Sequence, residues 1–310
     1  MVSGTGGNLS LGDIMDLGSV GVWTAFEGQP IGRAREAAAE LDELGYGALW
    51  FPEAVGREAL TQAALLLDAT STMVVATGIA RASLRDPMAT AMAHLTLTEA
   101  FPERFLLGLG GHRSPKQQLV PGFGGTLVAD PRPVGTMRDY LEAMDKAPVQ
   151  GFPPEVTPRR VLAALGPQML KLASEQAWGA HPYFVPVSHT ALARELLGPG
   201  PVLAVEQAVV LAGDREVARA HVGGYLAALH QANNLRRLGF TDADLADGGS
   251  DRLVDAITVV GDVEAVAKRV QEHLDAGANH VCLQVLTEDP RRIPLAEWRE
   301  LADLSRRHAA

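Results

Sequence analysis

The segment Phe101–Pro115, FPERFLLGLGGHRSP, decides the fold and is the first candidate for an active site. Its apolar run FLLGL is followed by Gly110 and Gly111, and then directly by His112 and Arg113. A short apolar run bounded by glycines indicates a buried strand that opens into a tight turn. Such a turn presents backbone N–H groups beside an imidazole and a guanidinium, which suits it to hold an anionic group. A turn that binds nothing is the alternative.

Strand-like and helical segments alternate on both sides of this stretch. Besides the run at 105–109, strands are predicted at Val20–Thr24, Ala48–Phe51, Met73–Ile79, Arg160–Leu165, Tyr183–Val185, Pro201–Leu211 and Val281–Leu286. Most of the intervening segments have apolar residues at helical spacing. This α/β pattern fits a closed (β/α)8 TIM barrel or an open doubly wound sheet. The count of eight strands favours the barrel, in which the site lies at the carboxyl ends of the strands.

A single domain over residues 1–310 is the simplest organisation, because barrels commonly have this length. Residues 1–17 are rich in glycine and serine and predict a flexible lead-in. Residues 214–260 are mostly polar and helical in pattern, and no run among them is typical of a strand that pairs with the others. We therefore expect a helical insertion between the seventh and eighth strands.

The composition limits the class of partner. The chain has 37 acidic residues against 27 Lys plus Arg, a formal charge of -10, which argues against a nucleic-acid surface and favours a small-molecule substrate. Cys282 is the only cysteine, so no internal disulfide forms and a reducing compartment fits. No basic leader and no apolar run of membrane length are visible. We expect a soluble cytoplasmic protein without membrane contact.

Known nucleotide and hydrolase motifs are missing. The segment GLGGHR partly matches the dinucleotide pattern G-x-G-x-x-G, but Arg113 replaces its last glycine and no helix begins promptly after it. There is no Walker A sequence and no G-x-S-x-G elbow. The histidines lack metal-ligand spacing, and one cysteine cannot build a zinc site, so no metal is expected. An organic cofactor is the economical explanation for an enzyme of this kind.

Glu53 ends the predicted second strand, in the sequence LWFPE. A carboxylate at the mouth of a barrel is a candidate proton acceptor. Capping a helix or fixing a loop is the alternative role for Glu53.

Two histidines are candidates for proton transfer. His112 follows the glycine turn, and an imidazole has an unperturbed pKa of about 6.5. His189 lies at another predicted strand end. A structural role is the alternative for both. His94, within a helix, and His181, at the start of a predicted strand, are expected to be structural.

Six segments resemble one known family when they are taken in order. They are LDELGYGALWFPEAVGR, VVATGIARASLRDP, AFPERFLLGLGGHRSP, VLAALGPQMLKLASEQAWGAHPYFV, LRRLGFTDADLADGGSDRLVDA and HLDAGANHVCLQVL. The chain from Gly18 to Leu286 is thereby similar to the luciferase-like monooxygenase superfamily, and within it to the oxidoreductases that use the deazaflavin coenzyme F420. This resemblance implies a TIM barrel, a homodimer and a cofactor ring that lies across the carboxyl ends of the strands.

The resemblance also implies roles for individual residues. Glu53 matches the acidic residue near the reactive ring, and Gly78 and Ile79 match a non-proline cis peptide behind the ring. Gly110, Gly111 and His112 match the loop beside the cofactor, and Leu165, Gly166 and Pro167 match a turn and helix start that approach its phosphate. Three further cofactor-binding candidates come from the strand pattern itself: Trp23 and Thr77 at predicted strand ends, and Arg113 as a charge partner beside the glycine turn.

One departure from the family narrows the expected activity. Relatives that oxidise sugar phosphates carry a carboxylate where this chain has Gly111, so that substrate class is not expected. The implied activity is hydride transfer between F420 and a small organic substrate that the sequence does not identify. The group that handles the proton stays open among His112, His189 and Glu53. An FMN-dependent monooxygenase and a deazaflavin-binding protein without turnover are the alternatives.

Overall fold

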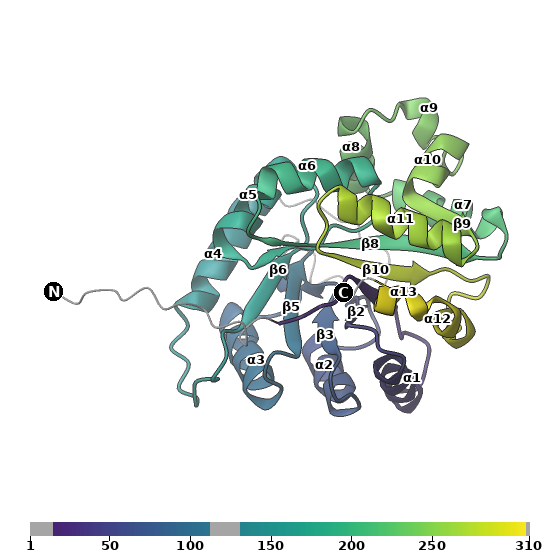
Figure 1. Cartoon of the computed structure of the whole chain (residues 1–310). Helices are drawn as coiled ribbons and strands as arrows, with labels where there is room; N and C mark the ends of the chain where they lie inside the picture. Colours follow the sequence, from purple (N-terminus) through teal and green to yellow (C-terminus); the bar gives the residue numbers. More distant parts are fainter. Residues whose placement is uncertain (1–14, 112–130, 308–310) are drawn as a thin grey trace.

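Eight parallel strands close into a barrel in the computed structural model, which describes residues 15–111 and 131–307 (Figure 1). The strands are β1 (Val20–Trp23), β2 (Ala48–Phe51), β3 (Val74–Thr77), β5 (Phe105–Gly110), β6 (Arg159–Leu162), β7 (Gly179–Ala180), β8 (Val202–Leu211) and β10 (His280–Val285). Each pairs with its neighbour, and β10 pairs with both β8 and β1, which closes the ring. The predicted TIM barrel is confirmed.

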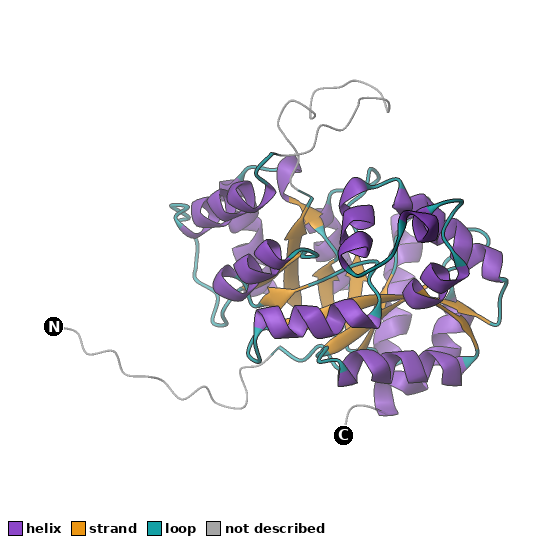
Figure 2. Ribbon diagram, turned by 90° about the horizontal axis from the view of Figure 1, so that it is seen from above, coloured by secondary structure: helices purple, strands orange, loops and turns teal. Residues whose placement is uncertain are grey.

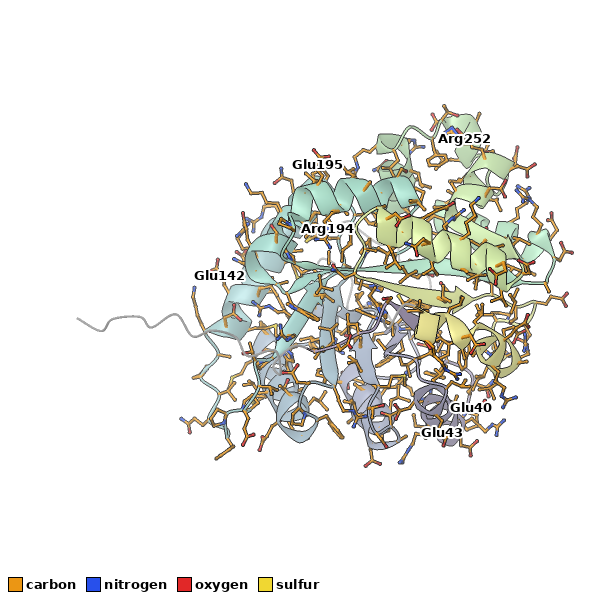
Figure 3. The ribbon with its side chains drawn as sticks, viewed as in Figure 1. Glu40, Glu43, Glu142, Arg194, Glu195 and Arg252 are labelled. Atoms are coloured by element: carbon orange, nitrogen blue, oxygen red, sulfur yellow. The ribbon has the colours of Figure 1, made fainter. Side chains whose placement is uncertain are left out.

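Helices surround the strands, as the view from above shows (Figure 2). They are α1 (Ile31–Glu43), α2 (Ala59–Asp68), α3 (Pro87–Ala100), α4 (Pro133–Asp145), α5 (Pro167–Gln176), α6 (Val187–Leu197), α11 (Val263–Asp275), α12 (Leu295–Leu301) and α13 (Asp303–Arg307). Charged side chains such as Glu40 on α1 and Glu142 on α4 lie on the outer helices (Figure 3). Among the described residues, none of the helices is both long and apolar enough to cross a membrane.

Two apolar layers follow from the alternation of side chains along each strand. One set of strand residues points outward into the core beneath the helices, for example Val205 on β8 and Leu283 on β10. The other set fills the barrel interior, and it includes Trp23, Trp50 and Cys282. Polar side chains on this inner face are therefore directed toward the barrel axis.

The segment between β8 and α11 holds four helices and one strand. The helices are α7 (Arg215–Leu226), α8 (Leu229–Arg237), α9 (Asp242–Leu245) and α10 (Asp251–Ile257). They are followed by β9 (Thr258–Gly261), which pairs in parallel with the end of β8. The expectation that residues 214–260 contain no pairing strand is therefore wrong. Because β9 has only four residues and follows a helix directly, its sequence pattern does not separate it from α10.

The third and sixth strands also differ from their predicted bounds. β3 ends at Thr77 and is followed by β4 (Ala80–Arg81) and a 3-10 turn, η1 (Ala82–Leu84). The strand predicted at residues 183–185 is not formed, and Phe184 has a positive φ of 59°. The sixth strand is instead β7, whose two small residues give no apolar run. His181 consequently follows this strand, and its expected place at the opposite end of the barrel is wrong.

Candidate active site

The end of β3 bulges into the mouth of the barrel. The Gly78–Ile79 peptide is cis, which confirms the geometry that the family resemblance implied. The Trp23 indole Nε1 donates to the Gly78 carbonyl oxygen at 3.1 Å. A Cβ atom on Gly78 would lie 2.7 Å from this nitrogen, so only glycine fits here. The Thr77 hydroxyl exchanges two 2.8 Å hydrogen bonds with the Gly108 backbone and ties this strand end to β5.

The end of β5 is the glycine turn from which the sequence analysis began. A Cβ on Gly110 would approach the Ala163 methyl group to 2.6 Å, and Gly111 has a φ of 60°. Both positions therefore require glycine, one for close approach and one for its backbone conformation. His112 and Arg113 lie outside the described residues, so their predicted roles stay predictions.

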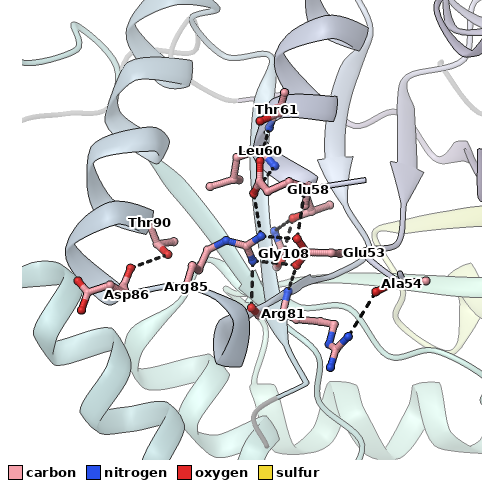
Figure 4. Close-up of polar contacts among 12 residues, drawn as sticks. Glu53, Ala54, Glu58, Leu60, Thr61, Arg81, Arg85, Asp86, Thr90 and Gly108 are labelled. Atoms are coloured by element: carbon pink, nitrogen blue, oxygen red, sulfur yellow. Dashed lines mark hydrogen bonds and ion pairs between the residues drawn. The ribbon is translucent and has the colours of Figure 1, made fainter. Parts of the chain in front are cut away.

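Glu53 is held at the end of β2 by four hydrogen bonds (Figure 4). Its Oε1 accepts from Ala59 N at 3.1 Å and from Arg85 Nη2, and its Oε2 accepts from Arg81 N at 2.7 Å and Arg85 Nη1 at 2.8 Å. Arg85 also contacts Glu58, the N-cap of α2. Because these bonds occupy the lone pairs of both carboxylate oxygens, the contacts match the loop-fixing alternative. Proton transfer by Glu53 stays a prediction.

The start of α5 faces a guanidinium. Gly166 is the N-cap and Pro167 the first helical residue, and a Cβ on Gly166 would lie 3.1 Å from Arg237 Nη1. Arg237 Nη2 donates to Asn234 Oδ1 at 3.0 Å, which fixes the side chain. A helix N-terminus carries a partial positive charge, and the guanidinium adds a full one. This corner of the mouth is suited to bind an anionic group.

His189 lies behind this corner on α6. Its Nε2 donates to the Leu165 carbonyl oxygen at 2.9 Å, and its Nδ1 has no partner within the described part of the chain. Burial lowers the pKa of His189, and the Arg237 charge lowers it further, although the Leu165 hydrogen bond acts in the opposite direction. The imidazole is thus a neutral group in a fixed orientation, and its catalytic role stays a prediction.

His181 is a buried residue of the site that the sequence analysis assigned to the scaffold. Its ring stacks on Trp50 with centroids 4.3 Å apart, and its Nδ1 donates to the Ala204 carbonyl oxygen at 2.9 Å. Its Nε2 lies 3.1 Å from the position of a Cβ on Gly78 and has no partner among the described residues. Burial lowers the pKa of His181 to about 4. No sequence signal pointed to His181, because the two small residues of β7 before it give no apolar run.

A second polar group at the mouth was also missed. The Tyr183 hydroxyl lies 2.8 Å from both the Tyr225 hydroxyl and Gln284 Oε1. Glu206, on the inner face of β8, accepts from Phe184 N at 2.9 Å through Oε2. Burial raises the pKa of Glu206 to about 8. A glutamate inside the apolar run VLAVEQAVVL was the available signal.

Comparisons with known proteins agree with this architecture. The sequence model of the family described as luciferase-like monooxygenase matches residues 13–280. A protein of Mycobacterium tuberculosis, provisionally named a coenzyme F420-dependent oxidoreductase, is 26% identical, and the alignment covers 88% of this chain and 95% of the relative.

Solved structures with the same fold include enzymes of both cofactor types. An F420-dependent secondary alcohol dehydrogenase, in complex with an F420–acetone adduct, matches 93% of this chain and 98% of its own with a TM-score of 0.71 and 15% identity. The coenzyme F420-dependent tetrahydromethanopterin reductase of Methanopyrus kandleri matches 92% of this chain and 97% of its own, with a TM-score of 0.67 and 16% identity. The FMN complex of a type II Baeyer–Villiger monooxygenase from Pseudomonas putida matches 95% of this chain and 98% of its own, with a TM-score of 0.67 and 16% identity.

Proposed function

This chain belongs to the luciferase-like monooxygenase family, and we propose that it is an oxidoreductase that uses coenzyme F420 to transfer a hydride to or from a small organic substrate. The observation that carries the choice of F420 is the Mycobacterium tuberculosis relative, since its provisional name specifies F420 and the alignment spans nearly all of both chains. The two F420-dependent enzymes of similar fold support the same choice.

The residues at the mouth fit a flat cofactor with a phosphate. Gly78 and Gly110 let the Trp23 and Ala163 side chains pack directly against the backbone at the mouth, because a Cβ at either position would clash with that neighbour. Gly166, Pro167 and Arg237 form the corner that suits a phosphate. We infer that the ring lies against the Gly78–Ile79 bulge and that the phosphate lies at the start of α5.

The chain supplies orientation. When bound, a deazaflavin supplies a ring carbon that gives or takes a hydride. Trp23 fixes the Gly78 carbonyl, and Thr77 fixes the adjoining strand, so the surface beneath the ring is rigid. Rigid placement of the reacting groups lowers the entropic part of the barrier.

FMN is the second candidate cofactor, because the FMN-bound monooxygenase matches this fold as well as the reductase does. A deazaflavin-binding protein without turnover is the third possibility. Fluorescence titrations of the purified protein with F420 and with FMN distinguish the cofactors. We expect tighter binding of F420, and micromolar FMN binding without F420 binding would overturn the proposal.

The phosphate corner has its own test. Arg237→Ala removes the guanidinium beside Gly166 and is expected to weaken F420 binding about tenfold, the effect of one charged contact. Arg236→Ala is the matched control, because Arg236 lies next to it on α8 but pairs with the exposed Asp242. If the two variants bound F420 with equal affinity, the phosphate would not lie at this corner.

We also propose that the chain forms a homodimer. The apolar side chains of Leu84, Met88 and Met92 are 49%, 39% and 42% exposed around the start of α3. Large exposed apolar side chains that gather in one place are typical of interaction sites. Light scattering of the wild type and of Met92→Glu tests this, with Leu229→Glu on α8 as the control. A monomeric wild type would contradict it.

A further inference from the structure

Three separate elements bring polar groups together at the Tyr183 hydroxyl. Tyr183 lies in the turn after β7, Tyr225 lies near the end of α7, and Gln284 lies near the end of β10. The Tyr183 hydroxyl is 2.8 Å from the Tyr225 hydroxyl and 2.8 Å from Gln284 Oε1. All three side chains are half-buried, so this group borders the mouth of the barrel.

A phenol has one proton, so Tyr183 donates to only one of these two partners at a time. When Tyr183 donates to Gln284, the Tyr225 hydroxyl donates a hydrogen bond to the Tyr183 oxygen. When it donates to Tyr225, the Tyr225 proton is free to point into the mouth. An acceptor atom that enters the mouth would select the second arrangement, because it gives the Tyr225 proton a partner.

The tyrosine pair lies beside the expected position of the coenzyme ring. The Tyr183 and Trp23 rings have centroids 5.0 Å apart. Trp23 in turn donates to the carbonyl of Gly78, in the cis bulge against which we place the ring. Trp23 therefore links the tyrosine pair to the bulge through two direct contacts.

Glu206 clamps the turn that carries Tyr183. Its backbone N–H donates to the Pro182 carbonyl at 3.2 Å, and its carboxyl Oε2 accepts from Phe184 N at 2.9 Å. Tyr183 is thus held on both sides by one residue of β8. Phe184 has a positive φ, a conformation that non-glycine residues rarely adopt. The two hydrogen bonds of Glu206 hold the turn in this conformation.

The pair keeps its protons over a wide pH range. Burial raises the pKa of Tyr183 well above its usual value, and burial also raises the pKa of Tyr225. Both hydroxyls are consequently hydrogen-bond donors at neutral pH rather than bases. A donor suits the reduction of a substrate, because the oxygen that gains charge then needs a proton.

We propose that Tyr225, backed by Tyr183, donates a proton to the carbonyl oxygen of an aldehyde or ketone substrate, and that Glu206 is the positioning residue for Tyr183. This inference rests on the proposed F420 chemistry. With the reduced coenzyme bound to supply a hydride to the carbonyl carbon, the carbonyl π electrons would move to oxygen, and that oxygen would take the Tyr225 proton. Tyr183 reprotonates Tyr225, and water restores the proton of Tyr183, so the product is an alcohol.

The first test uses protein labelled with 3-fluorotyrosine and followed by fluorine NMR. The chain has only four tyrosines, and Tyr→Phe variants assign their signals. Addition of F420 is expected to shift the signals of Tyr183 and Tyr225 but not that of Tyr46, whose hydroxyl is bonded to the Trp298 carbonyl. If F420 binds and leaves the pair unshifted, the inference is wrong while the proposed function stands. If F420 does not bind, the proposed function itself fails.

The second test measures reduction of a panel of aldehydes and ketones by reduced F420. Tyr225→Phe is expected to lower kcat about a hundredfold with unchanged F420 affinity, whereas Tyr46→Phe keeps the wild-type rate. Glu206→Gln retains an acceptor for Phe184 N–H and should keep most of the activity that Glu206→Leu loses. An unchanged kcat in Tyr225→Phe would overturn the donor role. F420 binding without reduction of any carbonyl would overturn the substrate class.

Discussion

Two buried glutamates near the mouth of the barrel differ in almost every contact. Glu53, at the end of β2, accepts four hydrogen bonds, two of them from the Arg85 guanidinium. Glu206, inside β8, accepts one hydrogen bond and takes part in no ion pair among the described residues. Burial without a cationic partner favours the neutral form of the Glu206 acid and raises its pKa.

Because the contacts of Glu53 and Glu206 differ, we expect the two residues to have different roles. The Glu53 carboxylate joins α2, β4 and Arg85 into one rigid unit, and its lone pairs are already occupied. Glu206 instead stands behind a pair of tyrosines that keep their protons and border the mouth. We therefore propose that the Glu53 side of the mouth is structural and that the β8 side handles the proton.

Arg85→Met is expected to have the largest effect. It leaves the Glu53 carboxylate buried without its cation, which should lower the free energy of unfolding by about 4 kcal/mol. Urea denaturation measures this change. Arg33→Met is the control, because Arg33 and Glu36 form an exposed pair and its loss should cost less than about 1 kcal/mol. Similar losses in the two variants would mean that Glu53 does not depend on Arg85.

Glu206→Gln is expected to change how stability depends on pH. Burial raises the pKa of Glu206 to about 8 in the folded state, so its contribution to stability is full below the unfolded pKa of about 4.3 and is lost as the pH rises through 8. Between pH 5 and pH 8 the wild type should lose about 3 kcal/mol relative to Glu206→Gln. If the free energies of unfolding of the two proteins changed in parallel with pH, Glu206 would not be neutral in the folded protein.

Glu58→Ala is expected to have the smallest effect. Glu58 is the second carboxylate on Arg85 and the N-cap of α2, where it accepts from Thr61 N at 2.7 Å. Its side chain is 49% exposed, so its loss should cost about 1 kcal/mol in urea denaturation. A cost as large as that of Arg85→Met would show that Arg85 serves Glu58 rather than Glu53.

The sequence predicted the fold well wherever a strand is a continuous apolar run. Strands at Ala48–Phe51 and 105–109 were predicted to within one residue, because each is apolar and bounded by glycine or proline. β7 was missed because Gly179 and Ala180 carry no apolar signal, and the nearby YFV segment was chosen in its place. That single shift also misplaced His181.

The candidate site was predictable only in part. Residues at or just after strand ends, such as Trp23 and Gly78, follow from the strand pattern together with the family resemblance. Glu206 was hidden because its strand is otherwise apolar, and a pattern of hydrophobicity does not reveal a buried acid. Tyr225 was hidden because it reaches the mouth from α7, within a segment that the sequence analysis treated as an insertion. The places of Glu206 and Tyr225 in the site depend on contacts between segments that are distant in the sequence.

The infrared spectrum of the carboxyl groups tests the division between the two glutamates most directly. A protonated carboxylic acid gives a C=O stretching band that a carboxylate lacks. We predict that the wild type at pH 7 shows this band, that Glu206→Gln loses it and that Glu53→Gln retains it. A wild-type spectrum without the band, or its loss in Glu53→Gln, would contradict the account.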